Sequence, residues 1–242
     1  MPHEIMNSYG QPIGVSLPEW TARPYPDGNI LQGRYCRLEH IQPQKHADSL
    51  YEAYQQTQDG RDWTYLSVGP FNDKASFEHY LQQLALSTDP LHYAVVDQLT
   101  GNALGTLALM RIDAANGSIE VGFVIYSSAL KHSRIATEAQ FLLMEYAFEK
   151  LGYRRYEWKC DSLNAPSRSA ALRLGFQFEG IFRYSTVYKG RSRDTAWFSI
   201  ISDEWSNLKQ AYVTWLDESN FDEYGRQRIR LSQLTQQEPE NS

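Results

Sequence analysis

The chain has 242 residues, 42% of them hydrophobic and 13% aromatic, and its 23 basic and 29 acidic residues give a formal net charge of −6. This length suffices for one large domain with a substantial core, and the aromatic content excludes a disordered chain. A general nucleic-acid-binding protein would carry the opposite charge balance. The two cysteines, Cys36 and Cys160, lie far apart in apolar segments and therefore predict buried thiols of a reducing compartment.

The sequence indicates neither a targeting segment nor a membrane-spanning segment. The first ten residues have neither a basic start nor an apolar stretch, so no signal peptide is indicated. No apolar run approaches the roughly 18 residues that a membrane-spanning helix requires. We therefore expect a cytoplasmic protein with no membrane partner.

Three regions follow one another along the chain. Residues 1–33 are rich in proline and show little periodicity, which predicts an extended N-terminal arm. Residues 34–205 are predicted to form the folded domain. Residues 206–242 are predicted to be the end of a helix and a polar tail, which is either solvated or an arm for a partner subunit. A homodimer joined through the arms is one arrangement that this organisation allows.

Within the domain, the hydrophobic spacing predicts an alternation of strands and helices. Strands are expected over residues 34–41, 91–97, 103–112, 118–126, 153–161, 176–188 and 194–201. Helices are expected over residues 46–56, 73–86, 136–151 and 166–174, and from Asp203 onward. Asn72 or Asp73 is the expected N-cap of the second helix. A three-strand meander that leads into a strand–helix–strand crossover implies an α/β fold with a mixed sheet covered by helices.

Several enzyme classes lack their motifs here. The glycines form neither G-x-G-x-x-G nor G-x-x-x-x-G-K-[ST], so dinucleotide-binding and P-loop sites are not indicated. There is no G-x-S-x-G nucleophile elbow. The six histidines are scattered without metal-ligand spacing, so we expect no metal site.

The strand over residues 118–126, the polar loop over 127–135 and the helix that opens at Ala136 predict an anion site. The first N–H groups of a helix have no intrahelical partner, and the helix dipole adds positive charge there. Ala136 is small enough for a ligand to approach the backbone. Further donors and charge come from Lys131, His132, Ser133 and Arg134. A pyrophosphate suits such a site; an ordinary solvated loop is the alternative.

These residues carry a family resemblance. Val121-Gly122-Phe123-Val124-Ile125-Tyr126, followed by Lys131-x-x-Arg134-x-Ala136-Thr137-Glu138-Ala139, resembles the coenzyme A signature [QR]-x-x-G-x-[GA] of the GNAT superfamily of N-acetyltransferases. Downstream, Asn164-x-x-Ser167-x-x-Ala170-x-x-Arg173-Leu174-Gly175-Phe176 is similar to the superfamily segment N-x-x-S-x-x-x-x-[KR]-L-G-F, most closely in the RimL-type branch of ribosomal-protein-alanine acetyltransferases. The resemblance implies the GNAT fold, an α/β fold whose mixed, mostly antiparallel central sheet is flanked by helices.

The chain departs from the signature at two positions. Lys131 stands where the family has Gln or Arg, and Arg134 stands where it has Gly. If Arg134 adopts a positive φ, the conformation costs about 1 kcal/mol, which a phosphate contact would offset.

The resemblance also implies a cosubstrate and its binding residues. Acetyl-CoA would be the acetyl donor, with no metal involved. Its pantetheine arm would lie along the strand edge formed by Phe123, Val124 and Ile125. Its pyrophosphate would lie over Lys131, His132, Ser133, Arg134, Ile135, Ala136 and Thr137, and the remaining contacts would come from Asn164, Ser167 and Arg173.

The implied reaction is direct attack of a primary amine on the thioester in a ternary complex. Glu120 is the candidate general base, directly or through a water, and a buried salt bridge is its structural alternative. Ser167 is the candidate donor to the leaving thiolate, and helix capping is the alternative for Asn164 and Ser167. Further candidates are Tyr184 or Tyr188 as the acid and Asp161 as a second base, whereas Cys160 is expected to be a core thiol.

The acceptor pocket is expected at the loop over residues 59–66, with Trp63 and Tyr65 lining it and Tyr184 opposite. A peptide N-terminus, a polyamine and an amino sugar all remain open as acceptors, as do acyl groups larger than acetyl. A non-catalytic coenzyme A-binding sensor or scaffold is the alternative function, favoured by Arg134 at the glycine position. A nucleic-acid surface is disfavoured by the net charge; its residues would be Lys131, Arg134, Arg154, Arg155 and Lys159.

Overall fold

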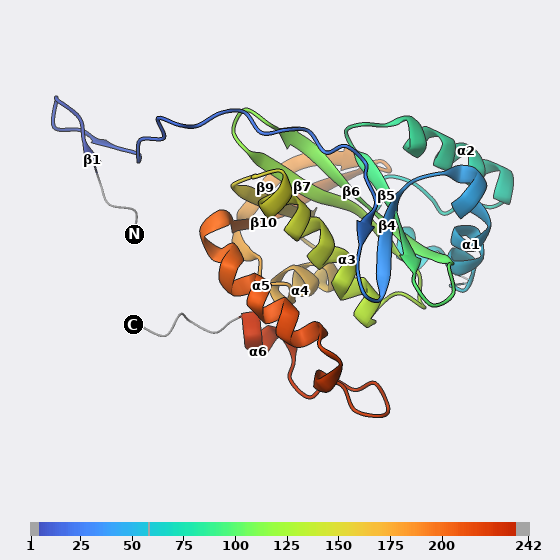
Figure 1. Cartoon of the computed structure of the whole chain (residues 1–242). Coiled ribbons are helices and arrows are strands. Elements are labelled where there is room, and N and C mark those ends of the chain that lie inside the picture. Colours follow the sequence, from blue (N-terminus) through green and yellow to red (C-terminus); the bar gives the residue numbers. More distant parts are fainter. Residues whose placement is uncertain (1–4, 58, 236–242) are drawn as a thin grey trace.

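An eight-stranded sheet forms the centre of the computed structural model, which describes residues 5–57 and 59–235 (Figure 1). Its strand order is β3-β4-β5-β6-β7-β8-β10-β9. The strands are β3 (Leu31–Gln32), β4 (Cys36–His40), β5 (Leu91–Asp97), β6 (Ala103–Asp113), β7 (Ser118–Tyr126), β8 (Arg155–Asp161), β9 (Gln177–Tyr188) and β10 (Arg191–Ile201). Strands β7 and β8 pair in parallel, and the other neighbours pair antiparallel. This confirms the predicted mixed, mostly antiparallel sheet.

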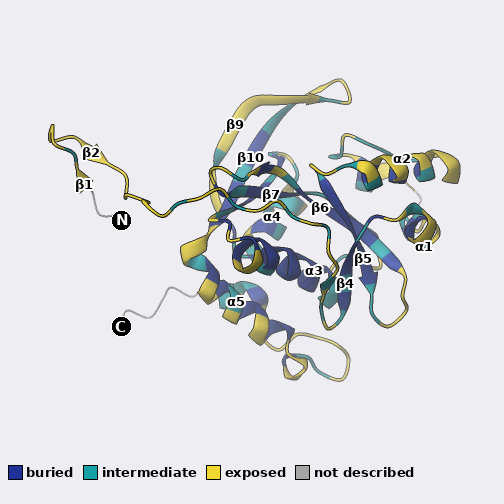
Figure 2. Ribbon diagram, turned by 45° about the horizontal axis from the view of Figure 1, so that its top comes forward, coloured by how far each residue is buried: buried dark blue, intermediate teal, exposed yellow. Residues whose placement is uncertain are grey.

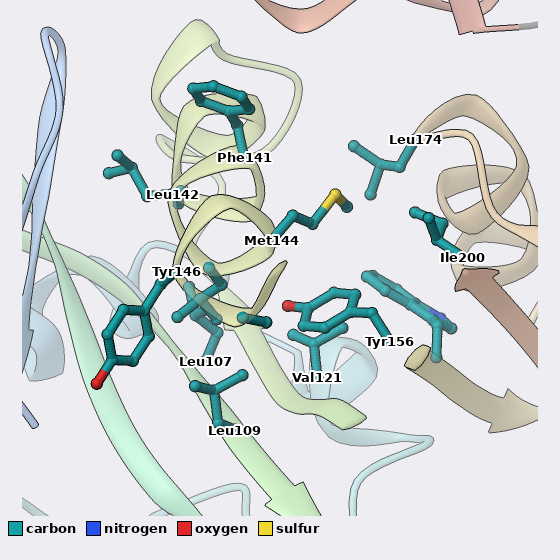
Figure 3. Close-up of a cluster of buried hydrophobic side chains, with 14 of the residues drawn as sticks. Leu107, Leu109, Val121, Phe141, Leu142, Met144, Tyr146, Tyr156, Leu174 and Ile200 are labelled. Carbon is teal, nitrogen blue, oxygen red and sulfur yellow. The ribbon is translucent and has the colours of Figure 1, made fainter. Parts of the chain in front are cut away.

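Helices cover the sheet from both sides. Side chains of α1 (Pro43–Gln55) and α2 (Lys74–Leu86) form one core with β5, β6 and Ile41, which follows β4. A larger core on the opposite face holds α3 (Arg134–Glu145), its π-helical extension (Tyr146–Lys150), α4 (Ala165–Arg173) and α5 (Ser202–Leu216). Figure 3 shows this larger core, where Leu142 and Met144 of α3 lie over Leu107 and Val121 of the sheet.

Strand alternation divides side chains between the two cores. In β5, Tyr93 and Val95 face the larger core, whereas Ala94 and Val96 face α1 and α2. Successive strand residues point to opposite faces, so the nearly continuous apolar run of this central strand serves both layers.

Local capping sets the helix starts. The Asp73 carboxylate accepts the N–H of Ser76 at 2.7 Å, which confirms the predicted cap of α2. Helix α3 begins at Arg134, two residues earlier than predicted, because Ser133 is its N-cap: the Ser133 hydroxyl accepts the N–H of Ala136 at 3.1 Å.

The β9–β10 hairpin is longer than predicted. Its turn consists of Lys189 and Gly190, with φ of 47° and 69°, which suits a tight two-residue connection; the expected five-residue turn over 189–193 is wrong. The Lys189 ammonium donates to the carbonyl oxygens of Trp63 and Gly69 at 2.8 and 2.9 Å. The hairpin tip therefore contacts the loop between α1 and α2.

The described part of the N-terminal arm runs away from the body to a small hairpin of β1 (Ile5–Met6) and β2 (Pro12–Ile13) (Figure 1). Trp20 anchors the arm, because its indole N–H donates to the carbonyl of Ala115 at 2.8 Å. Tyr25, further along the arm, is 62% exposed. The arm is mostly yellow, and thus exposed, in Figure 2.

Residues 218–235 pack onto the domain and do not form the solvated tail that is one of the two predicted arrangements. Helix α5 continues past residue 205 to Leu216, and a short 3-10 helix (Glu218–Asn220) and α6 (Leu231–Thr235) follow it. Leu231 is 1% exposed and belongs to the larger core, so this segment folds back onto the domain. Residues 236–242, the rest of the predicted tail, lie outside the described residues. Over the described ranges, none of the helices has the length and apolar character needed to span a membrane.

Candidate active site

Strands β7 and β8 separate at the centre of the sheet. They pair from Ser118 opposite Arg155 to Val121 opposite Trp158, and the pairing ends there. Beyond this point β7 contains a bulge: Gly122 pairs with Ala108 of β6 and Ile125 with Thr106, so two β7 residues oppose one β6 residue, and Phe123 has a φ of 47°. The β7 edge from Gly122 onward borders a cavity of about 1580 Å³.

The bulge reverses the alternation of side chains along β7. The sequence pattern predicts that Val124 and Tyr126 share a face with Glu120. This is wrong: both pack against the larger core, on the α3 side, as Val121 does. Phe123 instead turns to the opposite face, where its ring meets His92 at 5.1 Å between centroids.

The start of α3 forms one end of the cavity. Lys131, in the loop before the helix, lies 2.5 Å from the Asp62 carboxylate, so its charge is partly engaged by the α1–α2 loop. Arg173 of α4 donates to the Thr137 hydroxyl at 3.0 Å and thereby ties α4 to the first turn of α3. His132 has the left-handed backbone, with a φ of 60°, whereas Arg134 is the first helical residue. The strain expected at Arg134 therefore does not arise.

All but two of the predicted site residues line this cavity. Ile135 does not, because it packs against the larger core. Tyr184 does not either; it is 85% exposed on β9, so its predicted place opposite Trp63 is wrong, and Tyr188 lines the cavity in its stead. The predicted site residues that do line the cavity are Trp63, Tyr65, Glu120, Phe123, Val124, Ile125, Lys131, His132, Ser133, Arg134, Ala136, Thr137, Asn164, Ser167 and Arg173.

Glu120 lies in a buried charge network on the face opposite α3. The Lys159 ammonium is 2.9 Å from the Glu120 carboxylate and 2.6 Å from that of Glu157, and it lies 3.7 Å from the centre of the Trp197 ring. Arg111 approaches Glu120 to 3.5 Å. Burial raises the pKa of Glu120, and the nearby cations offset this only in part. The Glu120 carboxylate, which is the candidate base, is thus also a partner in a buried salt bridge.

The cap of α4 is Asn164, which leaves Ser167 free of that role. The Asn164 side chain accepts the N–H of Ser167 at 3.2 Å and caps the helix. The Ser167 hydroxyl accepts the indole N–H of Trp158 at 3.0 Å, and a hydroxyl that accepts in this way retains its own hydrogen for donation. Ser167 is therefore not the cap, and its hydroxyl borders the cavity.

Two further candidates lie beside the splayed strands. Tyr188 donates to the Asp161 carboxylate at 2.8 Å. Burial, together with this carboxylate, raises the pKa of Tyr188 to about 12, so its hydroxyl is protonated at neutral pH. Burial also raises the pKa of Cys160, which keeps it a thiol, as expected of a core residue.

The sequence reasoning missed three groups. Tyr54 of α1 donates to the carbonyl of Ile125 at 3.0 Å and so holds β7 in place beyond the bulge. The position of Tyr54 in the helix pattern gave no indication of this contact. The position of Lys159 could have been recognised in the sequence, because Glu157, Lys159 and Asp161 alternate with apolar residues along their strand. Residues after α5 also line the cavity, namely Gly225, Arg226, Gln227 and Arg230. Within the described residues, no cluster of three or more His, Cys, Asp or Glu side chains could hold a metal.

Comparison with known proteins agrees with this geometry. Residues 36–177, more than half of the chain, match the Acetyltransferase (GNAT) domain family. The chain belongs to the GNAT acetyltransferase family. A crystal structure of a GCN5-related N-acetyltransferase from Brucella melitensis is 49% identical and superposes with a TM-score of 0.89 over 90% of this chain and 99% of that one.

Two curated relatives are similar to this GNAT protein. It is 30% identical over 147 residues to "Uncharacterized N-acetyltransferase p20" of Bacillus licheniformis, which is 59% of this chain and 81% of that one. It is 30% identical over 109 residues to "Putative ribosomal N-acetyltransferase YdaF" of Bacillus subtilis (strain 168), which is 45% of this chain and 59% of that one. These matches confirm the resemblance to the RimL-type branch.

In this acetyltransferase, most of the basic side chains that a nucleic-acid surface would use are paired with carboxylates. Lys131 pairs with Asp62, Lys159 with Glu120 and Glu157, and Arg155 with Glu157 and Glu179. Three of the five cations are thus engaged with carboxylates, and Lys159 is buried. Such an arrangement does not favour a contiguous phosphate-binding surface.

Proposed function

We propose that this protein transfers the acetyl group of acetyl-CoA to a primary amine by direct attack within a ternary complex. One observation carries the proposal: the β7 edge freed beyond Val121 and the N-terminus of α3 border the same cavity. An extended pantetheine arm pairs with such an edge as an added strand does, and a helix N-terminus attracts a pyrophosphate.

The residues present fit this cosubstrate. The backbone from Gly122 to Ile125 offers hydrogen-bonding groups to the pantetheine amides. Lys131, Arg134 and Arg173 supply positive charge for the pyrophosphate, and the small side chain of Ala136 lines the cavity at the helix start. Because Arg134 is helical, the departure that favoured a non-catalytic coenzyme A-binding sensor or scaffold loses its force.

Glu120 is proposed as the base, and the acceptor amine determines how much help it must give. Deprotonating a lysine amine at pH 7 costs roughly 4.6 kcal/mol, against about 1 kcal/mol for an α-amine. Burial raises the pKa of Glu120, which makes the carboxylate a better proton acceptor than an ordinary glutamate. Glu120 lies on the sheet face opposite α3, so the acceptor enters from the side of Trp63 and Tyr65.

Ser167 is proposed to donate to the leaving thiolate. Its hydroxyl is oriented by Trp158, and it borders the cavity near the point where β7 and β8 separate. Tyr188 is the second candidate, because its hydroxyl is protonated at neutral pH and lines the same cavity.

A peptide N-terminus is the proposed acceptor class. The name of the Bacillus subtilis relative refers to ribosomal acetylation, and an α-amine makes the smaller demand on Glu120. An aromatic wall with Trp63 and Tyr65, beside a buried carboxylate, suits a cationic amine on a partly apolar peptide.

Thiol release from acetyl-CoA tests the proposal across an amine panel. The panel contains a peptide with a free N-terminus, the same peptide with a blocked N-terminus and one lysine, a polyamine and an amino sugar. We expect the free N-terminus to accelerate thiol release most. Binding of acetyl-CoA without acceleration by any amine would favour the sensor or scaffold, and absence of binding would overturn the cosubstrate.

A further inference from the structure

The segment after α5, residues 221–230, forms a loop that reaches the cavity; we call it the C-terminal loop. It lies beyond residues 36–177, where the chain matches the family, so no family pattern predicts its role. Arg226 and Arg230 of this loop line the cavity, whereas Arg228 between them does not.

The loop is held in place by its own contacts. The side-chain amide of Asn220 donates to the carbonyls of Trp215 and Ile229 at 3.0 and 3.2 Å, and its oxygen accepts the N–H of Ile229 at 2.8 Å. Gln227 accepts the indole N–H of Trp215 at 2.8 Å and forms a β-bridge with Phe221. The side chains of the loop therefore project from a fixed backbone.

The loop also contacts the start of α3. The Arg134 guanidinium lies 4.5 Å from the centre of the Phe221 ring. Figure 1 shows the segment after α5 at the end of the molecule where α3 begins. The loop thus extends the proposed pyrophosphate site outward, away from the separation of β7 and β8.

The charged side chains that line this end of the cavity are basic, although the chain as a whole is acidic, and Asp222 and Glu223 of the same loop do not line it. Among the described residues, no carboxylate forms an ion pair with Arg134, Arg173, Arg226 or Arg230. The carboxylates that line the cavity are engaged elsewhere: Asp62 with Lys131, Glu120 with Lys159, and Asp161 with Tyr188. Such a cluster of guanidinium groups suits a ligand with more than one phosphate.

We propose that Arg226 and Arg230 bind the ribose 3′-phosphate of coenzyme A. This inference rests on the proposed function. If the pantetheine arm follows β7 and the pyrophosphate lies at the start of α3, the next charged group along the ligand is the 3′-phosphate. The C-terminal loop borders the cavity at that end and presents two arginines to it.

Coenzyme A and 3′-dephospho-coenzyme A, which lacks only this phosphate, provide the test. Their dissociation constants are measured by calorimetry with the full chain, as the wild type, Arg226→Ala, Arg230→Ala and the double variant. Arg228→Ala is the matched control, because it removes the same charge from the same loop outside the cavity.

We expect the wild type to prefer coenzyme A by tenfold or more, since a guanidinium–phosphate contact is charge-assisted and each tenfold corresponds to about 1.4 kcal/mol. The preference should fall stepwise to near one in the double variant, weaken with salt in the wild type, and persist in Arg228→Ala. A preference unchanged in the double variant, or equal losses for both ligands, would overturn the 3′-phosphate site while leaving acetyl transfer intact. Failure of the wild type to bind either ligand would overturn the proposed function as well.

Discussion

Replacing Glu120 by glutamine separates its two roles, because glutamine keeps the shape and cannot accept a proton. If Glu120 takes the proton from the amine, kcat should fall about 100-fold or more at neutral pH, which corresponds to roughly 2.7 kcal/mol in the barrier. The loss should shrink as pH rises toward the pKa of the acceptor, since neutral amine then forms without assistance. Affinity for acetyl-CoA should hardly change, because the proposed donor contacts are made by the β7 backbone.

The structure bounds the accompanying loss of stability. Removing one partner of a buried ion pair costs about 3–5 kcal/mol when the other charge is left uncompensated. Lys159 keeps Glu157 at 2.6 Å, so Glu120→Gln should cost less than that range. Glu157→Gln is the matched control: it removes the other carboxylate from the same lysine, and Glu157 does not line the cavity.

The assay is the pH profile of kcat together with urea unfolding for both variants. In the wild type, activity should rise with pH through the pKa of Glu120, which burial places above that of an ordinary glutamate. Glu157→Gln should lose stability and keep this rise in activity, shifted toward lower pH, because the charge of Glu157 contributes to the raised pKa of Glu120. A Glu120→Gln enzyme with near-normal kcat at neutral pH, or a Glu157→Gln enzyme with the same pH-dependent loss, would refute the role of Glu120 and leave Asp161 or solvent as the base.

Three other predictions concern the cosubstrate loop, the leaving group and acid stability. Ala136→Glu should abolish acetyl-CoA binding in calorimetry without unfolding the protein, because it places bulk and negative charge at the start of α3; unchanged affinity in a folded variant would refute the loop assignment. Ser167→Ala should lower kcat with little effect on acetyl-CoA affinity, since the contact strengthens only in the transition state; equal losses of affinity and thermal stability would mark Ser167 as structural. Although burial opposes it, hydrogen bonds from Lys45, Arg37 and His46 lower the pKa of Glu39 from 4.5 to about 2. A depressed carboxyl pKa stabilises the fold above pH 4.5, and this contribution, about 3 kcal/mol, should be lost as pH falls toward 2. Urea midpoints of wild type and Glu39→Gln should therefore converge at low pH, and a constant difference would contradict this.

The sheet and most helices were predictable from sequence because their signals are local. The i, i+3, i+4 spacing around Phe77 and the cap at Asp73 define α2 without tertiary information, and the nearly continuous apolar run of β5 defines a buried strand. The cosubstrate loop was predictable for the same reason, because strand, loop and helix are contiguous there. The bulge at Phe123 was not, since its positive φ depends on the register between β6 and β7, which a single strand does not encode.

The acceptor side and the C-terminal loop depend on contacts between distant segments. Tyr184 was predicted to lie opposite Trp63 and Tyr65, but it is exposed on β9, and Tyr188 lines the cavity instead. Residues 218–235 look like a polar tail because most of their side chains are polar, yet contacts of Asn220, Phe221 and Leu231 hold them against the domain. A few such residues in a polar segment form too weak a pattern to recognise in a sequence.

The β7 bulge links the two halves of the proposed site. Before it, Glu120 faces the side of the sheet opposite α3 and is paired with β8 through Lys159. After it, Val124 and Tyr126 turn into the α3 core, and the strand edge, no longer paired with β8, borders the cavity. A Cβ at Gly122 would lie 2.3 Å from the sulfur of Met110, so a larger residue at this position would force the Met110 side chain to move. A single local irregularity therefore separates the face that carries the proposed base from the edge offered to the proposed cosubstrate, and in this proposal the amine would meet the thioester where the two strands separate.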